Sequence, residues 1–330
     1  MIPETLHVWT CRRYGGPEVL ALETRPCPAP RAGEVLIRIV ATTVSSADAR
    51  LRSCTLPRGF GLLGRAIFGF TGPRQPVLGT ELSGVIAAVG PGVATWQPGD
   101  AVIGFTGGRL GCHAEYRIMP AAGALVAKPA NLSFAEAAGL AFGGTAALDF
   151  LRRADLRAGE RVLVLGPAGA VGTALVQLAR LRGAHVTAVA RAANRDLVAA
   201  LGADRVLDSA AHDFTTAAET YDVIADTVGA TTFARAHPRL REHGRYLAFA
   251  ADLPGMRARP VGTKRSITGS ASERPEDVRE LARLAAAGDL RVVVGRTFAF
   301  AELPDAHAYV STGRKRGNAI VHVSAPPPRA

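Results

Sequence analysis

The sequence has few cysteines and no long hydrophobic run. Its 330 residues contain four cysteines, Cys11, Cys27, Cys54 and Cys112, with no C-x-x-C pair among them. This spacing argues against a structural metal and fits unpaired thiols in a reducing compartment. No stretch of about 18 uncharged apolar residues occurs, and the first residues lack the basic-then-apolar order of a signal peptide. We therefore expect a soluble, cytoplasmic protein that does not bind membranes.

Lysine is also scarce. Lys128, Lys264 and Lys315 are the only lysines among 39 basic residues, and the arginines are spread over the whole chain. The net charge of +11 therefore does not come from one basic patch, because the single local cluster, 314–316, is short. Nucleic-acid binding is not expected as the main role.

A turn punctuated by glycines follows the first strand of a long α/β pattern. The apolar run 162–165 leads into the turn, and the helical pattern 171–181 leads out of it. Glycines lack a β-carbon, so backbone N–H groups can approach a pyrophosphate while the helix N-terminus supplies partial positive charge. The residues expected at this dinucleotide site are Gly166, Gly169, Ala170, Val171 and Gly172.

Short apolar strands alternate with helices beyond this turn. Such alternation predicts a parallel sheet covered on both faces. The expected strands are 183–190, 205–208, 222–226, 244–249 and 291–294. The fold class is therefore α/β, with a Rossmann doubly wound parallel sheet over residues 130–297. Strand and turn patterns at 34–41 and 84–90 predict a β-rich second domain, which we assign to residues 1–129 and 298–330.

The end of the second strand of the α/β pattern indicates which dinucleotide binds. An acidic residue about 20 positions after the first glycine would accept hydrogen bonds from an NAD ribose. Arg191 stands there instead, and the nearest carboxylate, Asp196, falls inside the following helix, for which Asn194 is the expected N-cap. We therefore expect NADPH rather than NADH, with Arg191 on the 2′-phosphate. The alternative for Arg191 is a solvated surface arginine.

Several further motifs occur in a familiar order: 14–20 (YGGPEVL), 78–85 (LGTELSGV), 99–104 (GDAVIG), 201–208 (LGADRVLD) and 313–320 (GRKRGNAI). Together with the glycine turn they resemble the medium-chain dehydrogenase/reductase superfamily, in its quinone oxidoreductase (zeta-crystallin-like) branch. The resemblance covers essentially the whole chain. It implies a GroES-like first domain and hydride transfer from a nicotinamide bound between the domains.

Zinc-dependent alcohol dehydrogenases belong to the superfamily that this chain resembles, but their catalytic ligands are not kept here. Ser45 and Ala141 stand where the two cysteine ligands are expected, and Thr80 stands where the histidine is expected. Zinc requires thiolate, imidazole or carboxylate ligands, so no metal site is expected. His113 is expected to be a surface histidine rather than a ligand.

Without zinc, nothing lowers the pKa of an alcohol for oxidation. The leading hypothesis is an NADPH-dependent, zinc-independent oxidoreductase that passes hydride to a quinone or an α,β-unsaturated carbonyl. Two alternatives stay open. One is an NADPH-binding, zeta-crystallin-like protein with weak catalysis and a structural or RNA-binding role. The other is a pathway-specific enoyl or ketone reductase, whose larger pocket the apolar insert 58–70 would line or cover; that insert could equally be a loop pinned by aromatic residues.

The resemblance also assigns residues to the site. The remaining cofactor-binding positions are Thr145, Asn194, Val228, Phe249 and Asn318. Ser45, Asp48 and Arg52 are the candidate catalytic residues, with Ser45 or Arg52 donating to the developing enolate and Asp48 more suited to a structural hydrogen bond. Tyr246 is expected to pack in the core as a strand residue, with a cofactor contact as the alternative. The resemblance also implies a homodimer.

Overall fold

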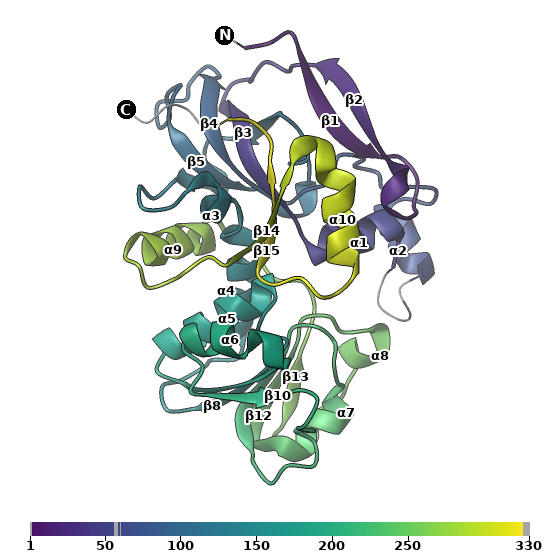
Figure 1. Ribbon diagram of the computed structural model, residues 1–330, viewed down its shortest axis with the longest axis vertical. Coiled ribbons are helices and arrows are strands. Elements are labelled where there is room, and N and C mark those ends of the chain that lie inside the picture. Colours follow the sequence, from purple (N-terminus) through teal and green to yellow (C-terminus); the bar gives the residue numbers. More distant parts are fainter. Residues whose placement is uncertain (1, 56–58, 60, 326–330) are drawn as a thin grey trace.

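The computed structural model describes residues 2–55, 59 and 61–325, and in it the chain forms two halves stacked along the long axis (Figure 1). The lower half contains a parallel sheet, and the upper half contains a mostly antiparallel sheet. The predicted combination of a Rossmann-like domain and a separate β-rich GroES-like domain is confirmed.

The lower sheet has six strands in the order β10-β9-β8-β11-β12-β13, with every pair parallel. This is the strand order of the classic dinucleotide-binding fold, and its reversal between β8 and β11 marks the point where ligands bind. The strands are β8 (Arg161–Leu165), β9 (His185–Ala190), β10 (Arg205–Asp208), β11 (Tyr221–Asp226), β12 (Leu240–Ala248) and β13 (Arg265–Ile267). The α-helices from the start of this half to its end are α4 (Ala141–Arg153), α5 (Ala170–Leu181), α6 (Arg195–Ala200), α7 (Phe233–Ala236), α8 (Leu253–Met256) and α9 (Pro275–Ala286). Short 3-10 turns are η3 (Ala192–Asn194) and η4 (His237–Arg239).

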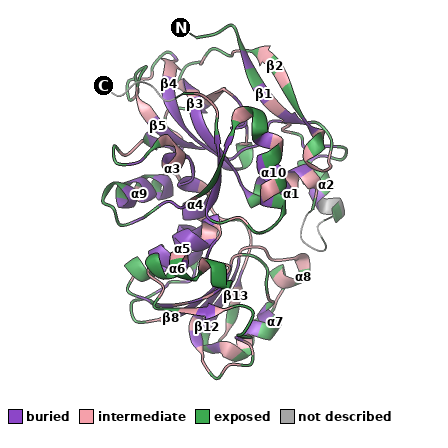
Figure 2. Ribbon diagram, in the orientation of Figure 1, coloured by how far each residue is buried: buried purple, intermediate pink, exposed green. Residues whose placement is uncertain are grey.

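The two faces of this sheet bury two different cores. Along β8, Val162 and Val164 belong to a large cluster with residues of α4, α5 and α9. Leu163 and Leu165 point the other way, into a cluster with Phe233 of α7. This alternation follows from the two-residue period of a strand, and it explains why β8 is apolar on both faces. In Figure 2, α5 is drawn largely in the colour of buried residues.

The upper sheet has the order β14-β15-β3-β4-β5-β7, with β6 also pairing with β3. A separate hairpin, β1 with β2, joins this half through a bridge between Val8 and Ala114. The strands are β1 (Thr5–Cys11), β2 (Leu20–Pro26), β3 (Glu34–Val44), β4 (Glu81–Val89), β5 (Ala101–Phe105), β6 (Tyr116–Pro120), β7 (Leu125–Ala127), β14 (Val294–Ala299) and β15 (Asn318–His322). The helical elements are η1 (Pro17–Val19), α1 (Ser46–Ser53), α2 (Gly61–Phe68), η2 (Gly107–Arg109), α3 (Phe134–Ala138), η5 (Phe300–Glu302) and α10 (Leu303–Ser311).

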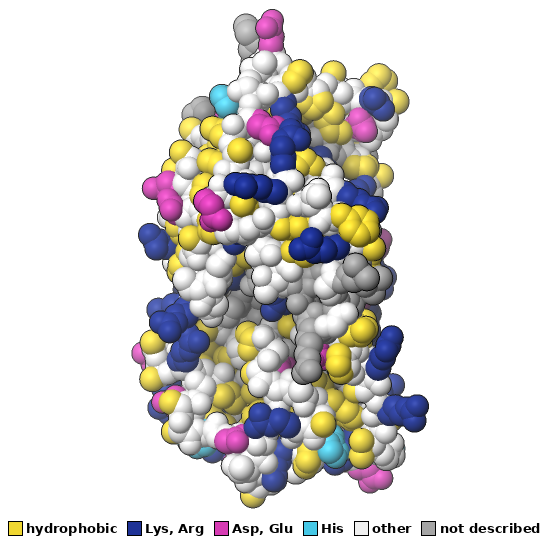
Figure 3. All heavy atoms as spheres, turned by 90° about the vertical axis from the view of Figure 1, so that its right-hand side faces the viewer, with side chains coloured by type: hydrophobic (Ala, Val, Ile, Leu, Met, Phe, Trp, Pro, Cys, Tyr) yellow, Lys and Arg dark blue, Asp and Glu magenta, His cyan; other side chains and the backbone are white. Residues whose placement is uncertain are grey.

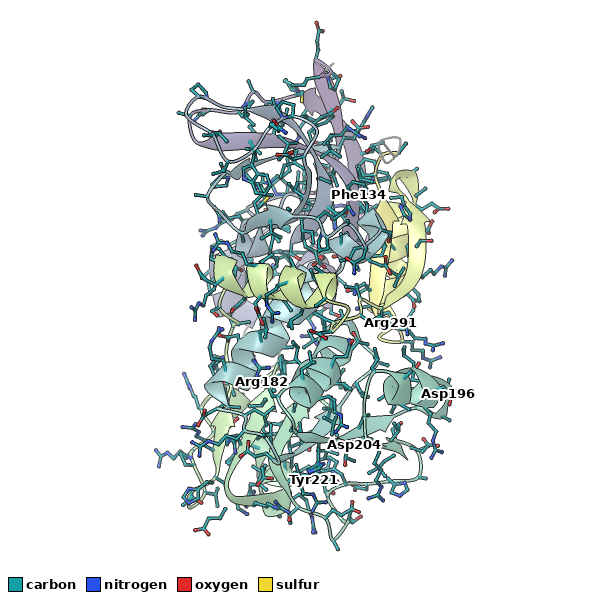
Figure 4. All side chains as sticks on the ribbon, turned by 90° about the vertical axis from the view of Figure 1, so that its left-hand side faces the viewer. Phe134, Arg182, Asp196, Asp204, Tyr221 and Arg291 are labelled. Atoms are coloured by element: carbon teal, nitrogen blue, oxygen red, sulfur yellow. The ribbon has the colours of Figure 1, made fainter. Side chains whose placement is uncertain are left out.

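One expected strand is wrong. Residues 291–293 form no strand, and β14 begins at Val294 and pairs with β15 in the upper sheet. Val292 and Val293 are nevertheless buried, in the core that α4 and α5 share. Their apolar character therefore reflects burial of an irregular connection rather than a place in the parallel sheet. Figure 4 shows Arg291 on this connection, at the waist between the two halves. The domain limits at 130 and 297 stay a prediction.

Helix length also bears on membrane crossing. None of the helices formed by the described residues is long and apolar enough to span a bilayer.

Candidate active site

The glycine turn lies at the end of β8, as predicted. Gly166 has a φ of +75°, a conformation that favours glycine. A β-carbon on Gly172 would lie 2.2 Å from the Gly166 carbonyl oxygen, so this position requires glycine for the helix to sit close on the strand. Helix α5 begins at Ala170, and its N-cap Gly169 offers no side-chain acceptor. The first N–H groups of α5 are therefore available to an anion.

The loop after β11 lies next to the glycine turn, because β11 is the neighbour of β8 in the sheet. Asp226 is buried, with 1% of its surface exposed, and its carboxylate organises this loop. The N–H groups that donate to it are those of Val228, Gly229, Ala230 and Thr231, at 2.8–3.1 Å. The loop holds the Val228 side chain 52% exposed, and a β-carbon on Gly166 would lie 2.5 Å from Val228 Cγ1. Val228 and the glycine turn are thus brought together.

Tyr246 is a core residue of β12. It is 3% exposed, and its hydroxyl donates to Asp226 Oδ2 at 3.1 Å and lies 2.9 Å from the Thr231 carbonyl oxygen. Its pKa is raised, chiefly by burial and by the Asp226 charge. The structure therefore gives Tyr246 the packing role, and Asp226 is an organising residue that the sequence analysis missed. An acidic residue ending a buried strand was the available signal.

The end of β9 carries the residues expected on the adenosine side of the cofactor. Arg191 is exposed directly after the strand, and its guanidinium has no hydrogen bond or ion pair with the residues that the structure describes. Asn194 precedes α6 without a capping side-chain bond. Asp196 lies in the first turn of α6, as predicted, at the outer edge of the molecule in Figure 4. Asp208, the partner of Ala190 in β10, accepts a bond from Ala210 N.

Three residues expected near the nicotinamide have side-chain partners within the protein. Thr145 is buried in α4, and its hydroxyl donates to the Phe142 carbonyl at 3.5 Å. Phe249 stacks on Phe150, with ring centroids 4.0 Å apart. Asn318 Nδ2 donates to Gly139 O at 3.1 Å and to Val293 O at 3.3 Å, so its amide ties β15 to the connection before α4.

The candidate catalytic residues lie in and around α1 and are all buried, 1–3% exposed. Ser45 and Asp48 form the capping box of α1, in which the Asp48 N–H donates to Ser45 Oγ at 3.1 Å and Ser45 Oγ donates to Asp48 Oδ2 at 2.6 Å. The other Asp48 oxygen accepts from Gly79 N at 2.9 Å. These bonds occupy both side chains and fix the start of α1.

Arg52 is held by three groups from distant segments. Its Nη2 donates to Ser311 Oγ at 3.0 Å, its Nε donates to His307 Nδ1 at 3.3 Å, and its Nη1 donates to the Gly15 carbonyl. Burial lowers its pKa. A donor directed at a substrate oxyanion would need free N–H groups in the cleft, whereas these N–H groups face α10 and the loop at Gly15.

Glu81 and Lys315 are charged groups of the site that the sequence analysis did not single out. Glu81 begins β4, and its carboxylate accepts from Thr43 Oγ1 and from Phe142 N, both at 2.7 Å. Burial raises its pKa to about 7, and the two hydrogen bonds oppose this shift. Burial also lowers the pKa of Lys315 to about 8, and the Glu81 charge opposes that shift. The rarity of lysine in this chain was the available signal for Lys315.

Helix α2 belongs to the apolar insert predicted from the sequence, whose residues Arg58 and Phe60 lie outside the described residues. Exposed Ile67 and Phe68 contribute to a pocket of about 230 Å³. The pocket is lined by Leu51, Ile67, Phe68, Pro73, Arg74, Gln75, Gly108 and Leu110. Figure 3 looks onto this side of the molecule and shows hydrophobic side chains in both its upper and its lower half.

Sequence comparisons agree with this architecture. Residues 31–130 match the alcohol dehydrogenase GroES-like domain, and residues 201–321 match the zinc-binding dehydrogenase family. The 2-methylene-furan-3-one reductase of Solanum lycopersicum is 30% identical over 335 aligned positions, which cover 97% of this chain and 80% of that protein. The chain belongs to the medium-chain dehydrogenase/reductase superfamily. It is therefore an oxidoreductase by family.

Two further members of this superfamily extend the comparison. The chloroplastic NADPH-dependent alkenal/one oxidoreductase of Arabidopsis thaliana is 29% identical, over 97% of this chain and 80% of its own. The solved structure of the quinone oxidoreductase from Coxiella burnetii superposes with a TM-score of 0.83 at 26% identity, over 97% of this chain and all of that chain. The similarity thus extends over both halves of the molecule.

The zinc implied by one of these family descriptions does not fit the residues present. Ser45 Oγ is bonded to Asp48, Ala141 has no donor atom, and Thr80 offers only a buried hydroxyl, for which no partner exists among the described residues. Within residues 2–55, 59 and 61–325 no cluster of three or more His, Cys, Asp or Glu could hold a metal ion. Zinc favours thiolate, imidazole and carboxylate ligands, so this donor set is unsuited to it.

His113 corrects one prediction, because it is fully buried rather than on the surface. Its Nε2 lies 3.0 Å from the Thr43 carbonyl oxygen, and its ring meets that of His307 edge-on, with centroids 5.4 Å apart. Burial lowers the pKa of both rings. The two rings are therefore uncharged and pack the residues around His113 against α10.

Proposed function

We propose that this protein is an NADPH-dependent, zinc-independent reductase that transfers hydride to a quinone or to the β-carbon of an α,β-unsaturated carbonyl. The observation that carries the proposal is that Ser45, Thr80 and Ala141 stand at the positions of the zinc ligands, because these side chains cannot hold a catalytic zinc ion. A hydride acceptor that needs no Lewis acid is then the compatible substrate. The similarity to a furanone reductase and to an alkenal/one oxidoreductase supports the same substrate class.

The cofactor preference rests on the end of β9. Arg191 is exposed and lacks an acidic neighbour at the position that would receive an NAD ribose. A bound nicotinamide dinucleotide would supply the hydride. The chain's own contribution is to hold the pyrophosphate at Gly166–Gly172, the 2′-phosphate at Arg191 and the nicotinamide edge near Val228.

Orientation is the main catalytic contribution that the described residues offer. The carboxylate of Asp226 fixes the Val228 loop, and the capping box fixes the start of α1. The nicotinamide and the substrate would therefore meet in a geometry that the protein sets in advance. Ser45, Asp48 and Arg52 are proposed as positioning residues in this scheme. The proton that completes enone reduction can come from solvent.

The test is to follow NADPH and NADH absorbance with purified protein in the presence of a chelator. The acceptors are an ortho-quinone, a small enone and a matched saturated ketone. We expect NADPH oxidation with the quinone or the enone, no change on chelation, and none with the saturated ketone. Chelator-sensitive turnover, or reduction of the saturated ketone alone, would contradict the proposal.

A second candidate, a reductase of bulkier pathway-specific enones, is favoured by the apolar pocket beside α2. The same assay discriminates it, because a large apolar enone should then have a higher kcat/KM than a small one. Cofactor binding with no turnover of any acceptor would instead favour the NADPH-binding protein with weak catalysis. The cytoplasmic location and the homodimer stay predictions.

A further inference from the structure

The loop before β15 is held against the glycine turn. Gly317 N donates to Ala168 O at 2.7 Å, and Gly317 forms a bridge with Gly169. This short parallel contact joins the C-terminal segment to the loop between β8 and α5. Lys315 stands two residues before that contact, and its Nζ reaches back to Gly317.

The Lys315 side chain is half-buried. Its Nζ donates to the Gly317 carbonyl at 2.8 Å, and that carbonyl is the only acceptor that the described residues give it. The low pKa caused by burial supports the same description. An ammonium has three N–H donors, so two of them lack a partner among the described residues, and a half-buried cation in this state favours an anionic ligand.

Two nearby polar groups cannot replace Lys315. The Asn318 amide, expected to face the cofactor, is bonded to Gly139 and Val293. Glu81 is the charged group that acts on Lys315, but an ionised carboxylate only accepts hydrogen bonds and would repel a phosphate. Lys315 is therefore the cation of this loop that lies beside the turn with free donors, whereas Arg314 and Arg316 are exposed.

We propose that Lys315 anchors the pyrophosphate of the dinucleotide from the side opposite the N-terminus of α5, as a cofactor-positioning residue. The proposal rests on the proposed function, since it assumes a dinucleotide at the glycine turn. The upper half would thereby contact the cofactor directly through its C-terminal loop. Bound cofactor would hold the turn and this loop together.

The test measures dissociation constants of NADPH, NADH and 2′-AMP for wild type, Lys315→Met and Lys315→Arg. NADPH and NADH carry the pyrophosphate, whereas 2′-AMP carries the 2′-phosphate and no pyrophosphate. Losing one charge-assisted bond should weaken NADPH and NADH alike by about 10- to 150-fold. 2′-AMP binding should stay within about twofold, and Lys315→Arg should recover most of the dinucleotide affinity. Arg314→Met, which removes a neighbouring exposed charge, is the matched control and should have little effect.

Any other pattern of ligand affinities counts against the proposal. Equal loss of 2′-AMP and dinucleotide binding in Lys315→Met would indicate a structural lysine, and unchanged dinucleotide affinity would remove Lys315 from the site. Loss of NADPH but not NADH would move it to the 2′-phosphate. Wild-type protein that binds NADPH but reduces no acceptor would contradict the proposed function while leaving the Lys315 result intact, and wild-type protein that binds no dinucleotide would overturn both.

Discussion

Arg52 donates from Nε to His307 Nδ1 at 3.3 Å, and this contact links α1 to α10 across 255 residues of sequence. The same guanidinium reaches Ser311 Oγ and the Gly15 carbonyl. The hydrogen bonds of one buried side chain therefore hold together the first loop, α1 and α10 of the upper half.

Arg52→Ala should lower stability rather than abolish chemistry. It would leave the half-buried Gly15 carbonyl and the buried His307 Nδ1 without their donor, at a cost of about 1–3 kcal/mol for the buried group. We expect a lower Tm, with kcat for the folded variant within about threefold of wild type. Thermal unfolding and kcat at a temperature well below the variant's Tm measure the two effects. A catalytic donor would give the reverse, an unchanged Tm with a large fall in kcat.

Ser45→Ala tests the capping role in the same way. Replacing a serine N-cap by alanine costs about 0.5–2 kcal/mol, and the Asp48 N–H loses its acceptor. We expect reduced stability with measurable activity remaining. Ser45→Thr, which keeps a hydroxyl cap, is the control and should restore most of the stability. Complete inactivation with normal NADPH binding would instead give Ser45 a direct part in the reaction.

Glu81 should make stability depend on pH. Its folded pKa of about 7 lies above the ordinary value of 4.5, so between these values the native state binds more protons than the unfolded state. Its contribution to the free energy of unfolding is fully present below about pH 4.5. As pH rises through 7 this contribution is lost, by up to about 3 kcal/mol. Glu81→Gln keeps an acceptor for Phe142 N and cannot ionise. Denaturant unfolding at several pH values should show a shallower decline for this variant than for wild type; parallel curves would contradict the raised pKa.

Arg191→Ala tests the cofactor preference. Loss of a charge-assisted bond to the 2′-phosphate, about 1.5–3 kcal/mol, should weaken NADPH by roughly 10- to 150-fold. NADH affinity should change little. Fluorescence titration with both cofactors measures the effect, and Arg195→Ala, at the exposed arginine that begins α6, serves as the comparison. An unaltered NADPH affinity would make Arg191 the solvated surface residue of the alternative interpretation.

Gly172→Ala should disturb the turn, because the added β-carbon would meet the Gly166 carbonyl oxygen at 2.2 Å. We expect a loss of about 1–3 kcal/mol from overpacking, together with weaker dinucleotide binding. Gly169→Ala is the matched control for stability, since its β-carbon would have its nearest neighbour 4.0 Å away. Equal unfolding midpoints for the two variants would contradict the close helix packing.

Much of the fold was predictable because it depends on near neighbours in the sequence. The apolar run of β8, the glycines after it and the helical period of α5 are local patterns, and they appear where predicted. The strand expected at 291–294 failed for a tertiary reason. Val292 and Val293 are apolar because α4 and α5 cover them, and a buried irregular segment has the same composition as a short strand.

The site divides in the same way. The sequence by itself determined the glycine turn after β8, the arginine after β9 and the absence of zinc-ligand side chains at Ser45, Thr80 and Ala141, because each depends only on residue type at a position. Tertiary structure alone decided that Arg52 bonds to His307, that His113 is buried and that Gly317 stands against the glycine turn. Burial and hydrogen bonding depend on segments that are distant in the chain, and folding brings those segments together.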